Sequence, residues 1–421
     1  MNRGDRPSRG ILLRLSSGAV VTLALGTALG LGTPAAADAQ SRLVVLREPD
    51  AIAVGLAIVL NSGSPWELDS EAGLASLAAL AAIEQVRPQL QAIGGRARIE
   101  CHAAATVITV HLPATTWRLG ALLFQDALFD QRISTEAIER GRAELLRMLE
   151  SQDPFTAGLR EALGRALFGD GHRWTRPPCG RPEAVRELTE ADVHRIRLSR
   201  FRPERAAAAI VGPVADAEAR AILAGFASDD GLPLLVPAPE SAEGEGRVHV
   251  PSSTVTTWVA IAYPFDGDTD LEALRLLGFY VRESLGPTAA RPDVYDISTA
   301  IERHGDGGWL TITLVTLPET ASAREEEVRA LVRETATTSL PDARFDALMR
   351  RYRGARMLDL ATPEARALDA ALDLFFDQRV RTPDSRMDAL TPGRLRRAAA
   401  ALQPPVAASL GPIGSDRAAK P

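Results

Sequence analysis

The chain has 421 residues, of which 46% are hydrophobic and 24% are charged, and its formal net charge at pH 7 is -6. This composition excludes a disordered or fibrous protein, and the length allows two domains with full hydrophobic cores. The acidic balance provides no basic field for a polyanion, which argues against nucleic acid as a partner.

The first 39 residues have the pattern of a secretory signal peptide. Arginines at positions 3, 6, 9 and 14 precede an apolar run over residues 15–32, and Ala37-Asp38-Ala39 matches the small-residue cleavage pattern. The alternative is a retained membrane anchor, but serines and glycines interrupt the run and a cleavage site follows it. We therefore predict cleavage after Ala39 and a periplasmic or secreted mature protein. No later segment of the sequence is long and apolar enough to span a bilayer.

The first half of the mature chain has strand-like and helix-like stretches in alternating blocks. Short apolar runs predict strands, and Ala- and Leu-rich stretches with apolar residues three and four apart predict helices. The predicted order is a strand over 52–60, a helix over 71–86, strands over 96–101 and 106–112, several helices, a helical stretch over 188–203 and a strand over 206–211.

The two cysteines of the chain are Cys101 and Cys179. After export they would meet an oxidising compartment, in which they could form one disulfide that closes a long loop. The alternative is two isolated buried thiols, because the sequence does not reveal the distance between them. In either case, two cysteines do not make a zinc-ribbon pattern.

The second half repeats the order of the first. Leu188-Thr189 and Leu390-Thr391 each open a helical stretch, and Gly212-Pro213 and Gly411-Pro412 each end the strand that follows, at a spacing of roughly 200 residues. The equivalent elements of the second half are a strand over 255–263, a helix over 270–283, strands over 294–301 and 309–315, further helices, and a strand over 406–410.

A Pro-rich and low-complexity stretch separates the two halves and is typical of a linker. The order of blocks favours an α+β fold of two homologous sandwich domains, each a largely antiparallel sheet with helices packed on one face. The predicted organisation is a signal peptide over 1–39, a first domain over 40–228, a linker over 229–246, a second domain over 247–415 and a tail over 416–421.

Read in order, a series of short phrases resembles the pitrilysin/insulinase metallopeptidases, which include the mitochondrial processing peptidases and the cytochrome-complex core proteins. The resemblance covers nearly the whole mature chain. Its landmarks are Asn61-Ser62-Gly63-Ser64 with Glu67, Glu71-Ala72-Gly73-Leu74-Ala75, Gly94-Gly95, Asp153-Pro154, Leu167-Phe168-Gly169 with His172 and Trp174, Gly180 with Pro182-Glu183, Leu188-Thr189, and Phe201-Arg202-Pro203 before Val211-Gly212-Pro213.

The resemblance places a zinc motif on the predicted helix over 71–86, and this sequence lacks it. In active members, the Gly-Leu-Ala phrase runs into His-x-x-Glu-His, which puts two imidazoles on one helical face for zinc and adds a glutamate as the base. Ser76, Ala79 and Leu80 stand at those three positions. Alanine and leucine have no donor atom, and a serine hydroxyl is a poor zinc ligand. We therefore predict no catalytic residue, no metal site and no cofactor.

The other functional positions of the family are changed as well. The third zinc ligand, a glutamate, would fall at or near Leu146, with Glu144 close by but out of register. Of the Arg and Tyr that hold the substrate backbone, only Tyr295 has a matching position, so we predict it as a substrate-binding residue. No pair among the six histidines has the i,i+3 or i,i+4 spacing of a helical metal site, and His102 beside Glu100 offers too few ligands.

The resemblance implies three functional hypotheses. The first is a non-catalytic subunit of an exported insulinase-like peptidase, which pairs with a zinc-bearing homologue to enclose a peptide-binding chamber. The second is a stand-alone peptide-binding or scaffold protein that adds a peptide strand to an exposed sheet edge, and stable homodimers that bind unfolded peptides without cleaving them would favour it. The third is hydrolysis by an unconventional site, which metal analysis would test.

Overall fold

The computed structural model describes residues 42–130, 132–226, 244, 246–305, 307–377 and 380–412. The predicted signal peptide, the predicted tail and all but Gly244 and Gly246 of the predicted linker lie outside the described residues. The described residues belong to one compact unit. The domain boundaries drawn from the sequence within this unit stay a prediction.

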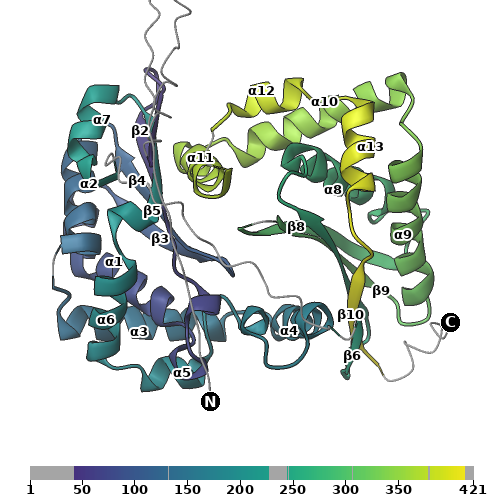
Figure 1. Cartoon of the computed structure of the whole chain (residues 1–421), viewed down its shortest axis with the longest axis horizontal. Helices are drawn as coiled ribbons and strands as arrows, with labels where there is room; N and C mark the ends of the chain where they lie inside the picture. The colour runs from purple at the N-terminus through teal and green to yellow at the C-terminus, as the bar shows by residue number, and fades with distance from the viewer. Residues whose placement is uncertain are drawn as a thin grey trace, which may run out of the picture. The chain divides into compact units, whose positions relative to one another are not determined.

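The first half of the chain forms a five-stranded sheet with the order β1-β5-β2-β4-β3 (Figure 1). Strand β1 runs parallel to β5, and the other neighbouring strands are antiparallel. The strands are β1 Leu43–Arg47, β2 Ala53–Leu60, β3 Arg96–Cys101, β4 Thr106–Pro113 and β5 Ala206–Gly212.

The second half forms another five-stranded sheet, with the order β6-β10-β7-β9-β8. Here too the first strand, β6, is parallel to its neighbour β10, and the remaining pairs are antiparallel. Element by element, this is the topology of the first sheet. The strands are β6 Arg247–Pro251, β7 Thr257–Asp266, β8 Val294–His304, β9 Gly307–Thr316 and β10 Val406–Gly411.

The α+β class and the largely antiparallel sheets predicted from the sequence are confirmed. The sequence analysis missed β1 and β6, which are short strands at one edge of each sheet. The helix predicted over 71–86 begins later and ends later than expected. Gly73, with a φ of 98°, precedes its first turn, and the helix continues past Pro88 because Leu90 is still buried in the core.

Helices of the first half cover the outer face of the first sheet. The central helix α1 packs against α3 and β3, and most of its residues are buried. These helices are α1 Leu74–Ala92, α2 Trp117–Gln125, α3 Thr135–Glu150, α5 Pro182–Glu187, α6 Glu190–Arg200 and α7 Asp216–Ile222, with short 3-10 or π turns at Ser64–Trp66, Asp69–Glu71, Asp126–Asp130, Arg173–Thr175, Pro203–Arg205 and Ala224–Phe226.

Helices of the second half cover the second sheet in the same manner. Helix α8 packs against β8 and against α9 and α13. These helices are α8 Leu271–Leu285, α9 Ala321–Thr337, α10 Asp342–Asp359, α12 Pro383–Asp388 and α13 Pro392–Ala400. Within the described residues, no helix is both long enough and apolar enough to cross a membrane.

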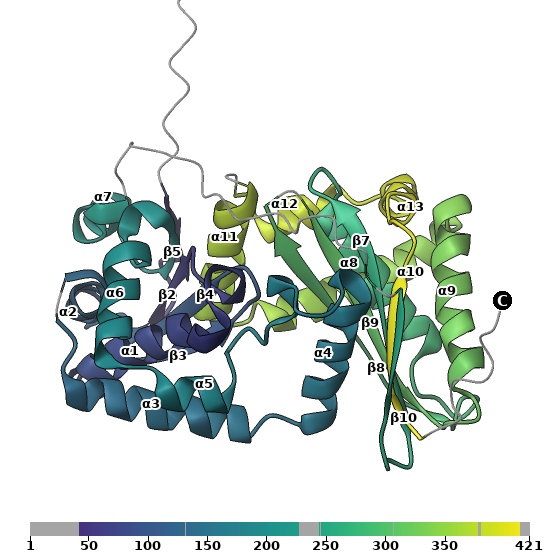
Figure 2. The ribbon, with the colours of Figure 1, turned by 60° about the horizontal axis from the view of Figure 1, so that its bottom comes forward.

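Two further helices cross between the halves. Helix α4, Pro154–Phe168, belongs to the first half of the sequence but packs on β6, β7 and β10 of the second sheet. Helix α11, Pro363–Asp377, belongs to the second half but packs on β2, β4 and β5 of the first sheet (Figures 1 and 2). Each sheet is therefore covered on both faces, and not on one face as the sequence suggested.

Small side chains allow the crossing helices to approach the sheets closely. Along β2 and β5, Leu56, Ile58 and Ile210 face the core under α1, whereas Ala57, Ala207 and Ala209 join a second core that includes residues of α4 and α11. At Gly55, an added Cβ would lie 2.3 Å from the backbone nitrogen of Glu364 at the start of α11. This second core is shared by both halves of the chain.

Candidate functional site

The three positions of the lost zinc motif lie on the buried side of α1. Ser76 is 1% exposed, Ala79 is 0% exposed and Leu80 is 3% exposed. Ala79 and Leu80 belong to the hydrophobic core of the first half. A catalytic metal needs both ligands and an opening to substrate, and these three side chains provide neither.

A disulfide lies directly beside the first of these positions. The sulfur atoms of Cys101, at the end of β3, and Cys179, before α5, are joined, and the Cα atoms are 5.3 Å apart. The Ser76 hydroxyl lies 3.4 Å from Cys101 Sγ. Of the two alternatives left open by the sequence, the structure therefore has the bonded pair. The bond connects β3 to the segment that packs against the first turn of α1.

A buried carboxyl group caps the start of α1. Glu67 Oε2 accepts a hydrogen bond from the Gly73 nitrogen at 2.8 Å, and Oε1 accepts one from the Ala75 nitrogen at 2.7 Å. Burial raises the pKa of Glu67 to about 7, although these two hydrogen bonds and Arg176 oppose the rise. Glu67 was one of the landmarks of the resemblance, but the sequence analysis did not predict its role as a cap.

The remaining predicted positions lie apart from one another. Leu146 on α3 packs at the margin of the first core, and Glu144 on the same helix forms an ion pair with Arg147. Tyr295 is 53% exposed and lies at an irregularity in the pairing of β8 with β9. Its role as a substrate-binding residue stays a prediction.

The histidines do not assemble a metal site in the part of the chain that the structure describes. No group of three or more His, Cys, Asp or Glu side chains there could hold a metal ion. The His102 Nε2 atom lies 3.9 Å from Glu100 Oε2 and has no third ligand in this set.

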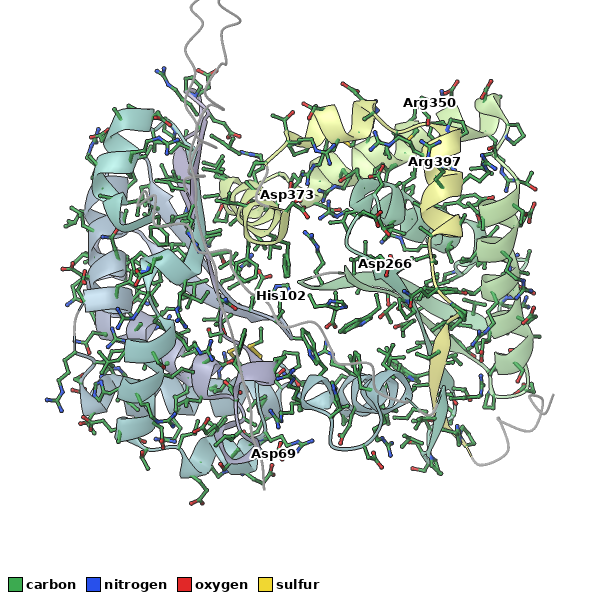
Figure 3. All side chains as sticks on the ribbon, viewed as in Figure 1. Asp69, His102, Asp266, Arg350, Asp373 and Arg397 are labelled. Carbon is green, nitrogen blue, oxygen red and sulfur yellow. A yellow bond between two sulfur atoms is a disulfide. The ribbon has the colours of Figure 1, made fainter. Side chains whose placement is uncertain are left out.

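A cavity of about 320 Å³ lies in the second half, and the sequence analysis did not predict it. Helices α8, α10 and α11 line it together with β8, and His102 reaches it from the turn after β3. In Figure 3, the label of His102 marks the turn after β3, and the label of Asp373 marks α11. Five consecutive residues of β8, 299–303, lie along the cavity. The residues that line the cavity are far apart in the sequence, from the turn after β3 to α11, so no local sequence signal could have revealed the cavity.

A network of buried ion pairs lies beside this cavity and holds α11 in place. Burial raises the pKa of Asp373 to about 6, against the opposing effect of Arg386. Burial would also raise the pKa of Asp369, but Arg275, Arg386 and Arg356 together lower it. The contacts are Arg386 to Asp369, Arg386 to Asp373 at 2.6 Å, Arg356 to Asp369 at 2.9 Å, Arg275 to Glu272 at 2.9 Å, and the Tyr352 hydroxyl to Glu272 at 2.6 Å.

Residues 187–352 match the family model described as the peptidase M16 inactive domain. Among curated proteins, an uncharacterized zinc protease from Mycobacterium leprae is 28% identical over 127 residues. This match covers 30% of the present chain and 28% of that relative, so the chain spans well under two thirds of its length.

Solved structures resemble this chain over most of its length. A peptidase M16 inactive domain from Pseudomonas fluorescens has a TM-score of 0.71 at 19% identity, and the match covers 91% of this chain and 98% of that one. A chain of complex III from Candida albicans has a TM-score of 0.71 at 15% identity, with coverage of 89% and 94%. A protease from Helicobacter pylori has a TM-score of 0.70 at 15% identity, with coverage of 88% and 96%. These similarities establish the fold.

Proposed function

Because the chain is an M16 peptidase-like protein of the pitrilysin-like family, we propose that it is a non-catalytic subunit. In this proposal it is exported to the periplasm or secreted, and it pairs with a zinc-bearing homologue to enclose a peptide-binding chamber. The chain would contribute part of the chamber wall, and the partner would carry out the hydrolysis.

The single observation that carries this proposal is that the face of α1 with the three motif positions is buried and has no zinc ligands. Ser76, Ala79 and Leu80 replace the ligands and the base, and all three are buried. The Cys101–Cys179 bond lies against the first of them. The fold around this face has nonetheless been kept, because the chain matches the structure of a peptidase M16 inactive domain over 91% of its length. A chain that keeps the fold but lacks the catalytic residues is suited to the role of a non-catalytic subunit.

Two further observations support pairing. The family match is to an inactive domain, and one of the similar structures is a chain within complex III, a multisubunit assembly by its name.

The test is purification of the tagged chain from its native source under mild conditions, followed by mass spectrometry. We expect a homologue of similar size that carries His-x-x-Glu-His, in a ratio near one to one. Peptide cleavage should require both chains and should stop when the partner's zinc motif is mutated. Recovery of this chain alone, with no zinc-motif homologue, would argue against the proposal.

A second candidate function is stand-alone peptide binding, and the free sheet edges favour it. Strands β3 and β8 lie at the edges of their sheets among the described strands. An edge strand offers unpaired backbone groups to an extended peptide. Under this alternative, the purified chain, as monomer or homodimer, would bind unfolded peptides without cleaving them and without a partner.

A further inference from the structure

The second half has an open cavity beside α8, the helix that corresponds to α1 in the repeated topology. The two sheets share one topology, so α8, β8 and α10 follow their strands in the order in which α1, β3 and α3 follow theirs. In the first half, buried side chains and the disulfide fill the space beside α1. In the second half, the space beside α8 is open over about 320 Å³. A volume of this size suits a ligand group as large as an amino-acid side chain.

Apolar side chains make up much of the cavity wall. Leu274 and Phe279 of α8, Leu310 of β9, and Leu372 and Phe376 of α11 all contribute to it. Such a wall favours an apolar ligand group, because removing apolar surface from water stabilises the complex.

Most of the charged groups at the cavity are already neutralised by ion pairs. Three of its arginines are paired, Arg275 with Glu272 at 2.9 Å, Arg356 with Asp369 at 2.9 Å and Arg303 with Asp377 through a hydrogen bond of 3.2 Å. Two of its carboxylates are also matched, since Asp373 lies 2.6 Å from Arg386 and Asp359 lies 4.0 Å from Arg356.

Two opposite charges remain. Arg282, in the last turn of α8, packs its guanidinium over the Phe279 ring at 5.3 Å and forms no ion pair with any residue that the structure describes. Glu302 of β8 likewise has no ion pair within the described part of the chain. Burial raises the pKa of Glu302, and Arg160 and His102 oppose the rise only from a distance.

These two charges lie toward opposite ends of the cavity wall and on different faces of the sheet, because Thr299 faces α8 whereas Glu302 is paired opposite Trp309 of the second core. A Cβ on Gly278 would lie 2.9 Å from Thr299 Oγ1, and one on Gly286 would lie 3.4 Å from Ile297 Cγ2, so α8 and β8 run in opposite directions. Arg282 is one helical turn beyond Gly278, and Glu302 is three strand residues from Thr299 in the other direction. The two residues are therefore about 16 Å apart along the cavity.

The edge of β8 supplies a backbone surface between these charges. Residues 299–303 line the cavity without a gap, and β8 pairs only with β9 among the described strands. A peptide that added to this edge in the antiparallel sense would run from Glu302 toward Arg282. Its carboxyl end would then approach the guanidinium of Arg282.

We propose that this cavity binds the carboxyl-terminal end of an extended peptide whose last residue is apolar. The last side chain enters the apolar part of the cavity, the terminal carboxylate pairs with Arg282, and the preceding residues lie along β8. The site rests on the peptide-binding role proposed above but needs no partner chain. Its failure would therefore leave the pairing with a zinc-bearing homologue untouched.

The test uses the purified full chain and hexapeptides of five alanines followed by phenylalanine or leucine, each labelled at the amino end for fluorescence anisotropy. Each peptide is made with a free carboxylate and with a carboxamide. We expect the carboxamide forms to bind at least tenfold more weakly, because they lose the ion pair with Arg282. A peptide that ends in aspartate should bind more weakly than either free peptide.

Arg282→Gln should weaken binding of the free carboxylate by the same factor and leave the carboxamide peptides unaffected. Arg350→Gln is the matched control, because Arg350 is an exposed arginine of α10 outside the cavity lining. Ala355→Phe, which fills the cavity wall, should abolish binding of all the peptides, while thermal melting confirms that each variant is folded. Equal affinity for carboxylate and carboxamide, an unchanged affinity in a folded Arg282→Gln variant, or no binding at all would overturn the proposal.

Discussion

At the scale of single residues, the face of α1 that would carry the zinc ligands lacks them, and other parts of the protein pack against it. Ser76 contacts a disulfide sulfur, and Ala79 and Leu80 pack in the core. Restoring the zinc motif would require three polar or charged side chains in a space that the present core fills. Burial of an unpaired charged group costs several kcal/mol unless the group is compensated.

The triple variant Ser76→His, Ala79→Glu, Leu80→His is therefore expected not to regain a zinc site. It should melt at a lower temperature than the wild type and carry much less than one zinc per chain after dialysis against zinc, because the position of the third ligand holds Leu146 and the disulfide lies against position 76. Elemental analysis by mass spectrometry measures the metal. The same measurement on the wild type serves as the reference. One tightly bound zinc per triple-variant chain would contradict this reading of the site.

Glu67 should make the stability of the protein depend on pH. Its pKa is about 7 in the folded chain, above the ordinary value of 4.5. Between these two values the unfolded chain releases a proton that the folded chain retains, so the free energy of unfolding falls as the pH rises from 4.5 to 7. The loss is about 3 kcal/mol for a shift of this size. In Glu67→Gln, this part of the pH dependence should disappear, which urea unfolding at pH 5, 6 and 7.5 would measure. Parallel curves for wild type and variant would show that Glu67 does not titrate in this range.

At the scale of elements, the contact between α11 and β2 depends on a glycine. A Cβ at Gly55 would approach the backbone of Pro363 and Glu364 to 2.3 Å, so Gly55→Ala must displace the start of α11. We expect it to lower the free energy of unfolding by about 1–3 kcal/mol, as overpacking does. Gly354→Ala is the matched control, because nothing lies within 4 Å of that site in the middle of α10. It should raise the stability by about 0.5–1 kcal/mol. Chemical denaturation measures both, and equal effects of the two substitutions would refute the close approach.

The elements also show which parts of the fold a sequence reveals. Strands β2 and β5 and helix α1 were predictable from the spacing of their apolar residues. This spacing puts the apolar side chains on one face of the element, which must be buried. Strand β1 was missed because its five residues form an edge and are mostly half-buried. The sheet on which α11 packs was not predictable, because a helix with an apolar face can pack on either sheet. The spacing of its apolar residues is the same in both cases. The absence of the zinc ligands could be predicted from three residues of the sequence. The cavity beside α8 could not, because it depends on tertiary contacts alone.

At the scale of the whole molecule, the exchange of α4 and α11 makes each half depend on the other. The inner face of the first sheet, with Ala57, Val59 and Ala209, is covered by a helix from the second half. The inner face of the second sheet, with Ala260 and Ala408, is covered by a helix from the first. The buried ion pairs of Asp369 and Asp373 join α11 to Arg386 of its own half. Each sheet therefore has a core of its own on one face, and on the other face it contributes to a core that both halves share.

Separate expression of the halves tests this interdependence. Residues 40–226 and residues 246–412, each produced alone, should expose the apolar face that the missing helix covers, and we expect neither to unfold in a sharp cooperative transition. Mixed in equal amounts, they should form a one-to-one complex that melts cooperatively, because each half then receives its crossing helix. Calorimetry and size-exclusion chromatography measure the two effects. A control chain that is cut after folding, at a protease site inserted between residues 226 and 246, should stay assembled. If either half alone melts as sharply as the intact chain, the shared core contributes little to its stability, and the halves are independent domains.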